Sequence, residues 1–413
     1  MKKFFSVGGL MAAALAWSSG GRAAGFDTPI LYSARHQAMG GTAIGYVSDP
    51  SATFHNPAGL AAVRRFSLLG DLSLLLGKVR ASPERGVSSI ESETVVAPFF
   101  MLAGAARLQD YVVLGLGVFP VASGGARYEY QLAGNRFVDS TNIVFVEVTP
   151  NISLQLPPSR ALPGRLSLGI GYRASVLLFN REKGAPDNPR VLNLDMTGAN
   201  FSGVRIGLQY RPVPSFGVGF VFRNRIEVAA RADESSVFVQ TATDTRLPFV
   251  LPAKVGAGMS FDTQALRLAC DAEYAFQDQN QRSNLTGTLN GTQASVPNVF
   301  SWQNGVTLRF GAEYRVAHGS QRYPIRAGYL YDSAVTDRRY PSAFGTPPAA
   351  THTVTVGTGL QTGVFQLNLA VARRFGSTKI GEADLGTGCG FCGYAGNYSI
   401  GMTGLYLDTS VDF

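Results

Sequence analysis

Alternation of apolar with polar or small side chains at a period of two recurs along most of this chain, and it limits the fold more than any other feature. In residues 203–211, Val, Ile, Leu and Tyr alternate with Gly, Arg and Gln, and residues 265–274, 306–315 and 365–372 repeat the pattern. Successive side chains of a β-strand point to opposite faces, so this period places the apolar and polar sets on separate faces of strands. The chain is therefore predicted to be all-β.

The number and spacing of these segments favour a closed barrel. We count about fourteen of them, an even number of the kind found in bacterial outer-membrane barrels. They lie at 66–77, 95–107, 111–120, 144–156, 165–178, 201–211, 216–229, 252–262, 265–276, 304–316, 322–332, 351–361, 364–375 and 400–413. Long polar stretches alternate with short turns between them, near 121–143, 179–200, 230–250, 277–303, 333–350 and 376–399. Short periplasmic turns alternating with long extracellular loops are typical of an antiparallel transmembrane β-barrel.

In such a barrel the charged face of each strand points into the lumen, because an Arg that faces lipid near the membrane midplane costs ~2–4 kcal/mol. Arg205, Arg267 and Arg309 lie on that face and are candidates for binding the anionic head group of a ligand. The alternative is that they form ion pairs with carboxylates that share the lumen. A soluble β-sandwich would also alternate, but the number and length of the segments disfavour it.

The two ends of the chain point to the same compartment. Residues 1–23 combine Lys2 and Lys3 with an apolar stretch and a final small-residue site, which is typical of a secretory signal peptide; the alternative is a short membrane anchor. The last segment ends on Phe413, and a C-terminal aromatic residue is what the outer-membrane assembly machinery usually recognises. We therefore expect insertion into the cell outer membrane, where lipid and lipopolysaccharide surround the barrel.

Residues 24–65 lack the strand pattern and carry the sharpest motif of the chain. Gly40-Gly41 is followed by Asp49 and then by Asn56-Pro57-Ala58-Gly59, just before the first strand. Taken alone, Asn before Pro indicates only a turn. In this position the motif resembles the N-terminal hatch of the FadL/TodX family of outer-membrane transporters for long-chain fatty acids and aromatic hydrocarbons, although Thr42 replaces the usual Gly or Ala.

The resemblance covers essentially the whole mature chain and implies both an architecture and a function. Residues 24–65 would form a hatch that plugs the lumen of a barrel built from residues 66–413. The function implied is passive uptake of hydrophobic small molecules, with long-chain fatty acids as the first candidates and aromatic hydrocarbons as the second. No cofactor and no metal are expected.

The resemblance also implies lateral release of the substrate through a kink in the third strand. In the third segment, Gly115, Gly117 and Pro120 are candidates for this opening. Glycine weakens a strand, and proline cannot donate a hydrogen bond to the ladder. The alternative is a strand that simply ends at Pro120.

Cys389 and Cys392 form a CxxC pair in a Gly-rich stretch that is not part of the family pattern. The spacing favours a local disulfide in an oxidising compartment. Free thiols are the alternative. Half of a metal site is the least favoured reading, because no second CxxC or nearby His pair completes it.

Three other functions compete with transport of hydrophobic compounds. A non-specific aqueous porin would share the barrel, and so would a purely adhesive or structural protein. A lipid-modifying enzyme is a further alternative, but none of the four histidines lies in a recognised Ser/His/Asp motif; they are His36, His55, His318 and His352. The net charge of +8 is spread without a Lys/Arg cluster, so nucleic acid is not an expected partner.

Overall fold

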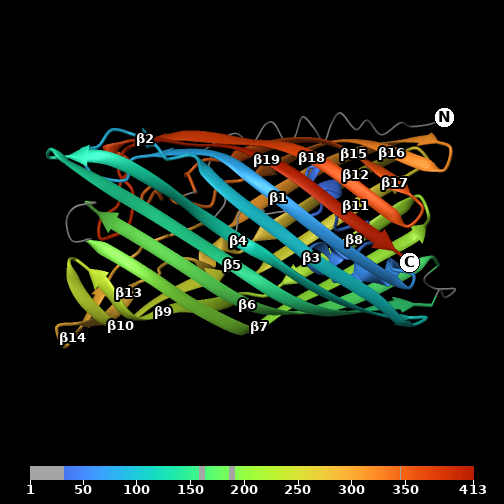
Figure 1. The fold of residues 1–413 in the computed structure, drawn as a ribbon, viewed down its shortest axis with the longest axis horizontal. Helices are drawn as coiled ribbons and strands as arrows, with labels where there is room; N and C mark the ends of the chain where they lie inside the picture. The colour runs from blue at the N-terminus through green and yellow to red at the C-terminus, as the bar shows by residue number, and fades with distance from the viewer. Residues whose placement is uncertain (1–31, 158–162, 186–190, 345) are drawn as a thin grey trace, which may run out of the picture.

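The computed structural model describes residues 32–157, 163–185, 191–344 and 346–413, and these residues form a closed antiparallel β-barrel (Figure 1). The elements are α2 (Ala34–Gln37), α3 (Ala52–His55), η1 (Pro57–Ala62), β1 (Phe66–Ala81), β2 (Ile90–Glu91), β3 (Val95–Gln109), β4 (Val112–Leu132), β5 (Asn135–Leu156), β6 (Arg165–Gly184), β7 (Leu192–Val213), β8 (Phe216–Arg223), β9 (Ile226–Val237), β10 (Gln240–Leu251), β11 (Lys254–Asp262), β12 (Leu266–Ala275), η2 (Gln277–Gln279), β13 (Leu285–Leu289), β14 (Thr292–Val296), β15 (Gly305–His318), β16 (Gln321–Asp332), β17 (Thr351–Thr362), β18 (Phe365–Ile380), η3 (Glu382–Asp384) and β19 (Gly396–Asp412).

The barrel closes because β1 pairs with β3 on one side and with the last strand, β19, on the other. β8 and β9 together make one wall strand, and β10 and β11 make the next, since β10 pairs with β9 and β11 pairs with β8. β2, β13 and β14 are short additions at the extracellular rim. The wall therefore has the predicted 14 strands. Within the described part of the chain, no helix is both long and apolar enough to cross a membrane.

The predicted assignment of the two strand faces is confirmed. On β1, Leu68 and Leu72 are 47% and 64% exposed on the outer face, whereas Asp71 is 1% exposed and points inward. The arginines that alternate with apolar residues, among them Arg205 and Arg309, are likewise buried in the lumen. Apolar side chains thus face lipid and polar ones face inward, as the cost of a lipid-facing charge requires.

Several of the predicted loops are wrong, because the strands continue beyond the apolar band. The stretch at 121–143 is the outer part of the hairpin β4–β5, which turns at Ala133-Gly134 with positive φ angles of 49° and 82°. The stretch at 230–250 is the hairpin β9–β10, and the strands also extend into 179–200 and 376–399. Polar composition marks where the wall leaves the lipid, whereas backbone pairing persists in water as long as the register allows it.

Residues 32–65 fill part of the lumen, and most of them are buried; the exposed ones are Ser48, Ala62, Arg64 and Arg65. Their short helices contact β17, β18 and β19 on one side and β4 to β7 on the other. The predicted signal peptide at 1–23 and residues 24–31 of the predicted hatch lie outside the described residues. We call residues 32–65 the plug.

Candidate functional site

The Asn-Pro-Ala turn ties the plug to the wall. Asn56 is fully buried; its Nδ2 donates hydrogen bonds to the carbonyls of Ile44, at 2.9 Å, and Leu208 of β7, at 3.1 Å. Its Oδ1 accepts from the backbone N–H of Ala58 at 3.2 Å, which caps η1, and Pro57 takes the first position of that helix. One side chain therefore fixes the helix start and its place against the barrel.

Inward-facing glycines of the wall let the plug backbone approach closely. A Cβ on Gly328 of β16 would lie 2.0 Å from the backbone nitrogen of Gly40, and a Cβ on Gly207 of β7 would lie 2.0 Å from Oδ1 of Asn56. Gly40 and Gly41 have φ angles of +67° and +80°, a conformation that favours glycine. The predicted Gly-Gly step thus turns the chain where it touches the wall.

Asp49 holds the turn of the plug together electrostatically. Its carboxylate lies 3.5 Å from Arg35 and 3.6 Å from His36, and it accepts a hydrogen bond from the backbone N–H of Ser51 at 2.9 Å. Burial raises the pKa of Asp49, but His36, Arg35 and Ser51 outweigh that effect and hold the pKa well below its usual value. The carboxylate is therefore charged and paired inside the plug.

The three candidate head-group arginines are each engaged with a carboxylate. The shortest ion-pair contacts join Arg205 to Glu147 at 3.5 Å, Arg267 to Asp262 at 2.5 Å and Arg309 to Glu273 at 3.5 Å. Arg205 also donates to the carbonyl of Thr53 in the plug, at 2.5 Å. This geometry supports the alternative that lumen arginines pair with carboxylates.

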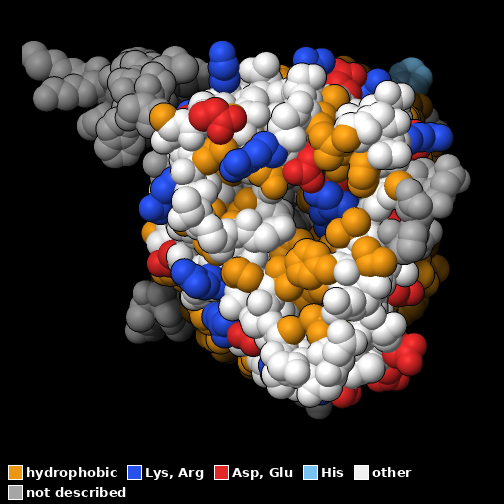
Figure 2. Space-filling view, turned by 90° about the vertical axis from the view of Figure 1, so that its left-hand side faces the viewer, with side chains coloured by type: hydrophobic (Ala, Val, Ile, Leu, Met, Phe, Trp, Pro, Cys, Tyr) orange, Lys and Arg blue, Asp and Glu red, His pale blue; other side chains and the backbone are white. Residues whose placement is uncertain are grey.

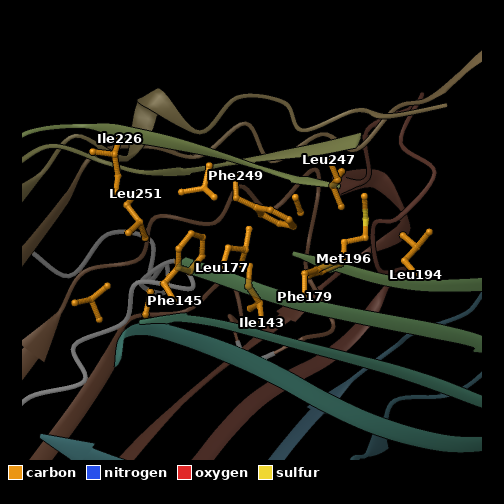
Figure 3. Close-up of a cluster of buried hydrophobic side chains, with 14 of the residues drawn as sticks. Ile143, Phe145, Leu177, Phe179, Leu194, Met196, Ile226, Leu247, Phe249 and Leu251 are labelled. Carbon is orange, nitrogen blue, oxygen red and sulfur yellow. The ribbon is translucent and has the colours of Figure 1, made fainter. Parts of the chain in front are cut away.

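A cluster of buried apolar side chains, which we call the apolar cluster, occupies the lumen on the extracellular side of the plug (Figure 3). Phe249 of β10 points toward Phe145 and Phe179 of the opposite strands, with ring centroids 6.5 and 4.9 Å apart, and Leu177 and Met196 complete this part of the cluster. The extracellular end of the molecule is hollowed, and hydrophobic side chains show at the bottom of the hollow (Figure 2). The hollow therefore has apolar side chains at its bottom, close to the outer mouth.

The ladder between β3 and β4 is interrupted beside this apolar cluster. Paired residues run up to Leu102 and Val118. Beyond them, the described part of β3 pairs with β1 and the described part of β4 pairs with β5. Contact resumes where the N–H of Glu93 donates to the carbonyl of Arg127 at 2.8 Å. We call this interruption the wall gap; its cavity of about 420 Å³ is bordered by Val95–Phe99 and by Ser123–Arg127.

Of the three residues predicted for a lateral opening, the structure brings Pro120 to the wall gap. Pro120 has no N–H, and the register of β4 against β5 shifts between Pro120 and Ala122, as in a β-bulge. Gly115 and Gly117 lie on the periplasmic side of the gap, in the paired part of the ladder, where they face Leu60 and Thr53 of the plug.

A group of three aromatic rings, which the sequence analysis missed, joins the plug to the wall gap. Tyr32 and Phe54 of the plug and Phe119 of β4 have ring centroids 5.2 to 5.8 Å apart. The hydroxyl of Tyr32 donates to the carbonyl of Pro120 at 2.6 Å. The sequence gives only a weak indication of this group: Tyr32 and Phe54 are aromatic residues in the segment without alternation, and Phe119 directly precedes Pro120.

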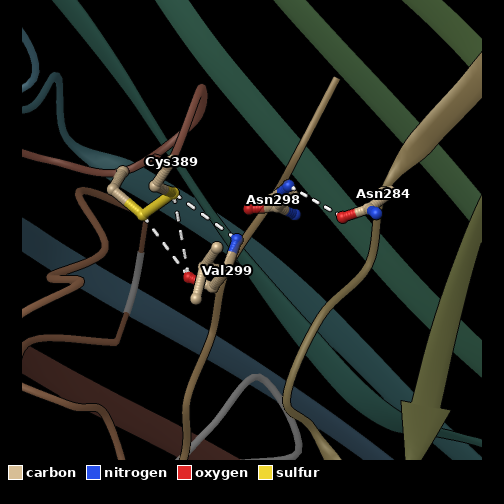
Figure 4. Close-up of a disulfide and its surroundings, with 5 residues drawn as sticks. Asn284, Asn298, Val299 and Cys389 are labelled. Carbon is tan, nitrogen blue, oxygen red and sulfur yellow. Dashed lines mark hydrogen bonds between the residues drawn. A yellow bond between two sulfur atoms is a disulfide. The ribbon is translucent and has the colours of Figure 1, made fainter. Parts of the chain in front are cut away.

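Cys389 and Cys392 form the local disulfide, with Cα atoms 5.7 Å apart (Figure 4). The backbone N–H of Val299, from the connection between β12 and β15, lies 3.4 Å from Sγ of Cys389. Neighbouring backbone hydrogen bonds join Gly390 to Pro297 and Gly393 to Pro341. The bridge thus fastens the β18–β19 connection to two other extracellular connections.

The histidines do not assemble a site for metal binding. His36 and His55 lie in the plug, and Nδ1 of His352 is 2.7 Å from the hydroxyl of Tyr329 on the outer face of the barrel. Burial, followed by the charge of His36, lowers the pKa of His55 to about 3, so its ring is neutral at neutral pH. Across the residues placed by the structure, no group of three or more His, Cys, Asp or Glu side chains suits a metal ion.

Solved structures with this architecture confirm the fold. A Pseudomonas aeruginosa FadL homologue superposes with a TM-score of 0.73 at 15% identity, covering 94% of this chain and 100% of that chain. The Pseudomonas putida toluene transporter TodX gives 0.69 at 17% identity, covering 93% and 98%. The Ralstonia pickettii toluene transporter TbuX gives 0.65 at 15% identity, with the same coverages.

Among curated protein sequences, none matches the chain. The sequence profile of one protein family, described as outer membrane protein transport protein (OMPP1/FadL/TodX), matches residues 12–371. The match spans more than half of the chain, including the described plug and most of the wall. The chain therefore belongs to the OMPP1/FadL/TodX family of outer-membrane transport proteins.

Proposed function

We propose that this protein carries hydrophobic compounds passively across the outer membrane, with long-chain fatty acids as its first substrates and lateral release through the wall gap. The observation that carries the proposal is that the apolar cluster adjoins the wall gap and its cavity, with Phe99 common to both, while the plug lies on their periplasmic side. A straight path through the lumen would have to displace the plug, whereas the wall gap leads sideways toward lipid.

Apolar enclosure supplies the driving force for binding. Each buried methylene contributes ~0.8 kcal/mol, so an alkyl chain of about fifteen carbons gains on the order of 12 kcal/mol when it is fully enclosed. Transit requires that no single site hold the substrate so tightly. A hollow that is open at the extracellular end, followed by a cavity at the wall gap, encloses only part of the alkyl chain at a time, which favours movement.

Aromatic hydrocarbons are the second candidate substrates, because two proteins that share the fold are toluene transporters. One feature favours fatty acids. Arg374 of β18 lines the inner end of the wall-gap cavity, where its Nη2 donates to Thr351 at 2.9 Å and lies 3.6 Å from Asp332. Although it is paired, Arg374 retains a buried Nε with no hydrogen-bond partner among the residues that the structure describes, so it keeps a donor for a carboxylate in the apolar slot, whereas toluene has no group that would use it.

Obstruction of the wall gap tests the exit route. We expect Ser123→Trp, which adds bulk at the border of the gap, to reduce oleate uptake into cells at least severalfold. The matched control is Leu116→Trp on the same strand, a lipid-facing position that is 51% exposed below the gap and where uptake should not change. Gly117→Trp is less suitable, because a Cβ there would lie 2.5 Å from Thr53 of the plug. Equal uptake by both variants and the parent would contradict the lateral route.

Substrate class is tested by Arg374→Gln with oleate and toluene in parallel. We expect weaker oleate binding and unchanged toluene uptake. If the variant binds oleate and takes up toluene as the parent does, the fatty-acid assignment is contradicted, whereas the proposed route is not. An aqueous porin would instead show large ion conductance in planar bilayers, and a lipid-modifying enzyme would release lipid products; we expect neither from the purified parent.

A further inference from the structure

The outer face of the barrel carries a cluster of cations at its extracellular edge, apart from the transport route. Lys78 and Arg80 of β1 are exposed, with side-chain exposures of 53% and 44%, and both contact one carboxylate, Glu91, at 3.3 and 3.0 Å. Arg373 of β18 is also exposed on this face. Lys379 lies further along the same strand toward the extracellular end and is exposed as well. Four cations thus face outward at this edge, and Lys78 and Arg80 share the carboxylate of Glu91.

Strand register brings two of these cations together over a notch. Lys78 pairs with Gly401 of β19, and Gly401 pairs with Phe375 of β18. Phe375 lies two residues beyond Arg373 on the same strand, toward the extracellular end. A Cβ on Gly401 would lie 3.2 Å from Nη2 of Arg373, so the guanidinium leans over the glycine toward Lys78. Arg373 also donates to Oγ1 of Thr403 at 2.9 Å, and among the described residues no carboxylate pairs with it. The glycine leaves the space between the two cations free of side chains.

The position of Arg373 in the wall calls for an anionic neighbour. The residues that flank it on the outer face, Val371 and Phe375, are apolar and 45% and 46% exposed to lipid. A charge inside an apolar band is costly at the membrane midplane, and that cost becomes small near the interface. The cluster therefore sits where the acyl chains of the outer leaflet give way to head groups.

An apolar groove adjoins the cluster on its periplasmic side and extends over β1, β19 and β18 to β17 and β16; on β18 it reaches Val371, two residues before Arg373. It has a volume of about 870 Å³ and is lined mainly by lipid-facing side chains. These include Leu72, Leu405, Leu407, Leu369, Val371 and Val356. Cations above a groove with acyl-chain dimensions form an amphipathic surface, and the ligand that complements it has phosphate above and several alkyl chains below.

From this juxtaposition we propose that the outer face of β1, β18 and β19 binds the phosphorylated head group of an outer-leaflet glycolipid, with its acyl chains in the groove. The chemistry required is that of lipid A, an acylated disaccharide with two phosphates. Lys78 and Arg373 bind one phosphate over Gly401, and Arg80 lies beside them. Charge-assisted hydrogen bonds to phosphate oxygens are the strong kind that hold such a group. The free ion is not the ligand, because it would make no use of the groove.

The test is a titration of the purified full-length barrel in detergent with bisphosphorylated lipid A, followed by native mass spectrometry. We expect the double variant Lys78→Gln/Arg373→Gln to bind this lipid at least tenfold more weakly than the parent. Dephosphorylated lipid A should bind both proteins equally. The matched control, Arg64→Gln/Arg322→Gln, removes two exposed cations elsewhere in the chain and should bind like the parent.

A second variant separates charge from shape. Gly401→Val retains all four cations but fills the notch, and it should also weaken binding of bisphosphorylated lipid A. A heat-dependent gel shift checks that each variant is folded. Unchanged affinity of the double variant, or an equal loss in the control, would overturn the proposal. Displacement of the lipid by millimolar inorganic phosphate would show a site for the free ion and would overturn it as well.

Discussion

Replacement of Asn56 by Ala should unseat the plug while leaving the wall intact. The change removes the hydrogen bonds from Nδ2 to Ile44 and Leu208, a longer and weaker one at 3.4 Å to the carbonyl of Phe220, and the cap on the N–H of Ala58. The carbonyl of Ile44 retains a second donor, Nε2 of Gln209, at 3.1 Å. We therefore count the net loss as two buried hydrogen bonds, about 2–3 kcal/mol. Since ~1.4 kcal/mol is a factor of ten, the unseated population should rise about 30- to 150-fold.

Hydrogen exchange of individual amides measures that population, because protection reports the free energy of local opening. The amides of Gly59 and Val63, which donate to carbonyls within η1 and its cap, should exchange faster by this factor, while amides of β12 and β15 should not change. Asn56→Asp keeps the oxygen that caps η1 and loses the donors, so its plug amides should exchange at rates between those of Asn56→Ala and the parent. Exchange of the plug within twofold of the parent in Asn56→Ala would refute the reasoning.

Two further predictions concern the plug. Because the pKa of His55 is lowered to about 3 in the seated plug, against ~6.5 when it is free, seating is fully stable above pH 6.5 and weakens as the pH falls from 6.5 toward 3. The open population of the plug, measured by hydrogen exchange, should therefore rise by up to about tenfold per pH unit below 6. His55→Gln should remove most of this pH dependence. An equal pH dependence in the variant would contradict the role of His55. Gly328→Ala should prevent close seating, since its Cβ would meet the backbone of Gly40, whereas Gly70→Ala, with its nearest atom at 3.9 Å, should be silent in the same exchange assay.

Much of the barrel could be predicted because a period of two is a local property. Each strand reports which of its faces is apolar, as Leu68 and Leu72 against Asp71 illustrate, and the cost of a lipid-facing charge then orients the wall. The ends of the strands could not be predicted in the same way. The hairpins β4–β5 and β9–β10 extend into polar sequence, since pairing depends on the neighbouring strand and not on hydropathy.

The plug motif and the CxxC bridge could also be recognised from short stretches of sequence. Asn56 and Pro57 act as a turn and a helix start, which is chemistry within a few residues. The role of the lumen arginines could not be predicted, because Arg205 of β7 pairs with Glu147 of β5, and period-two patterns do not reveal which residues of different strands meet.

The alternating sequence by itself determined an all-β wall, the assignment of its faces and the presence of a segment that is not wall. Only the tertiary structure decided where the wall is interrupted, since the gap depends on which residues of β3 and β4 face each other and on where Glu93 meets Arg127. The same is true of Tyr32, whose hydroxyl reaches the carbonyl of Pro120, 88 positions away in the chain. Local patterns specify how a residue is oriented, whereas contacts between distant residues exist only once the barrel has closed around the plug.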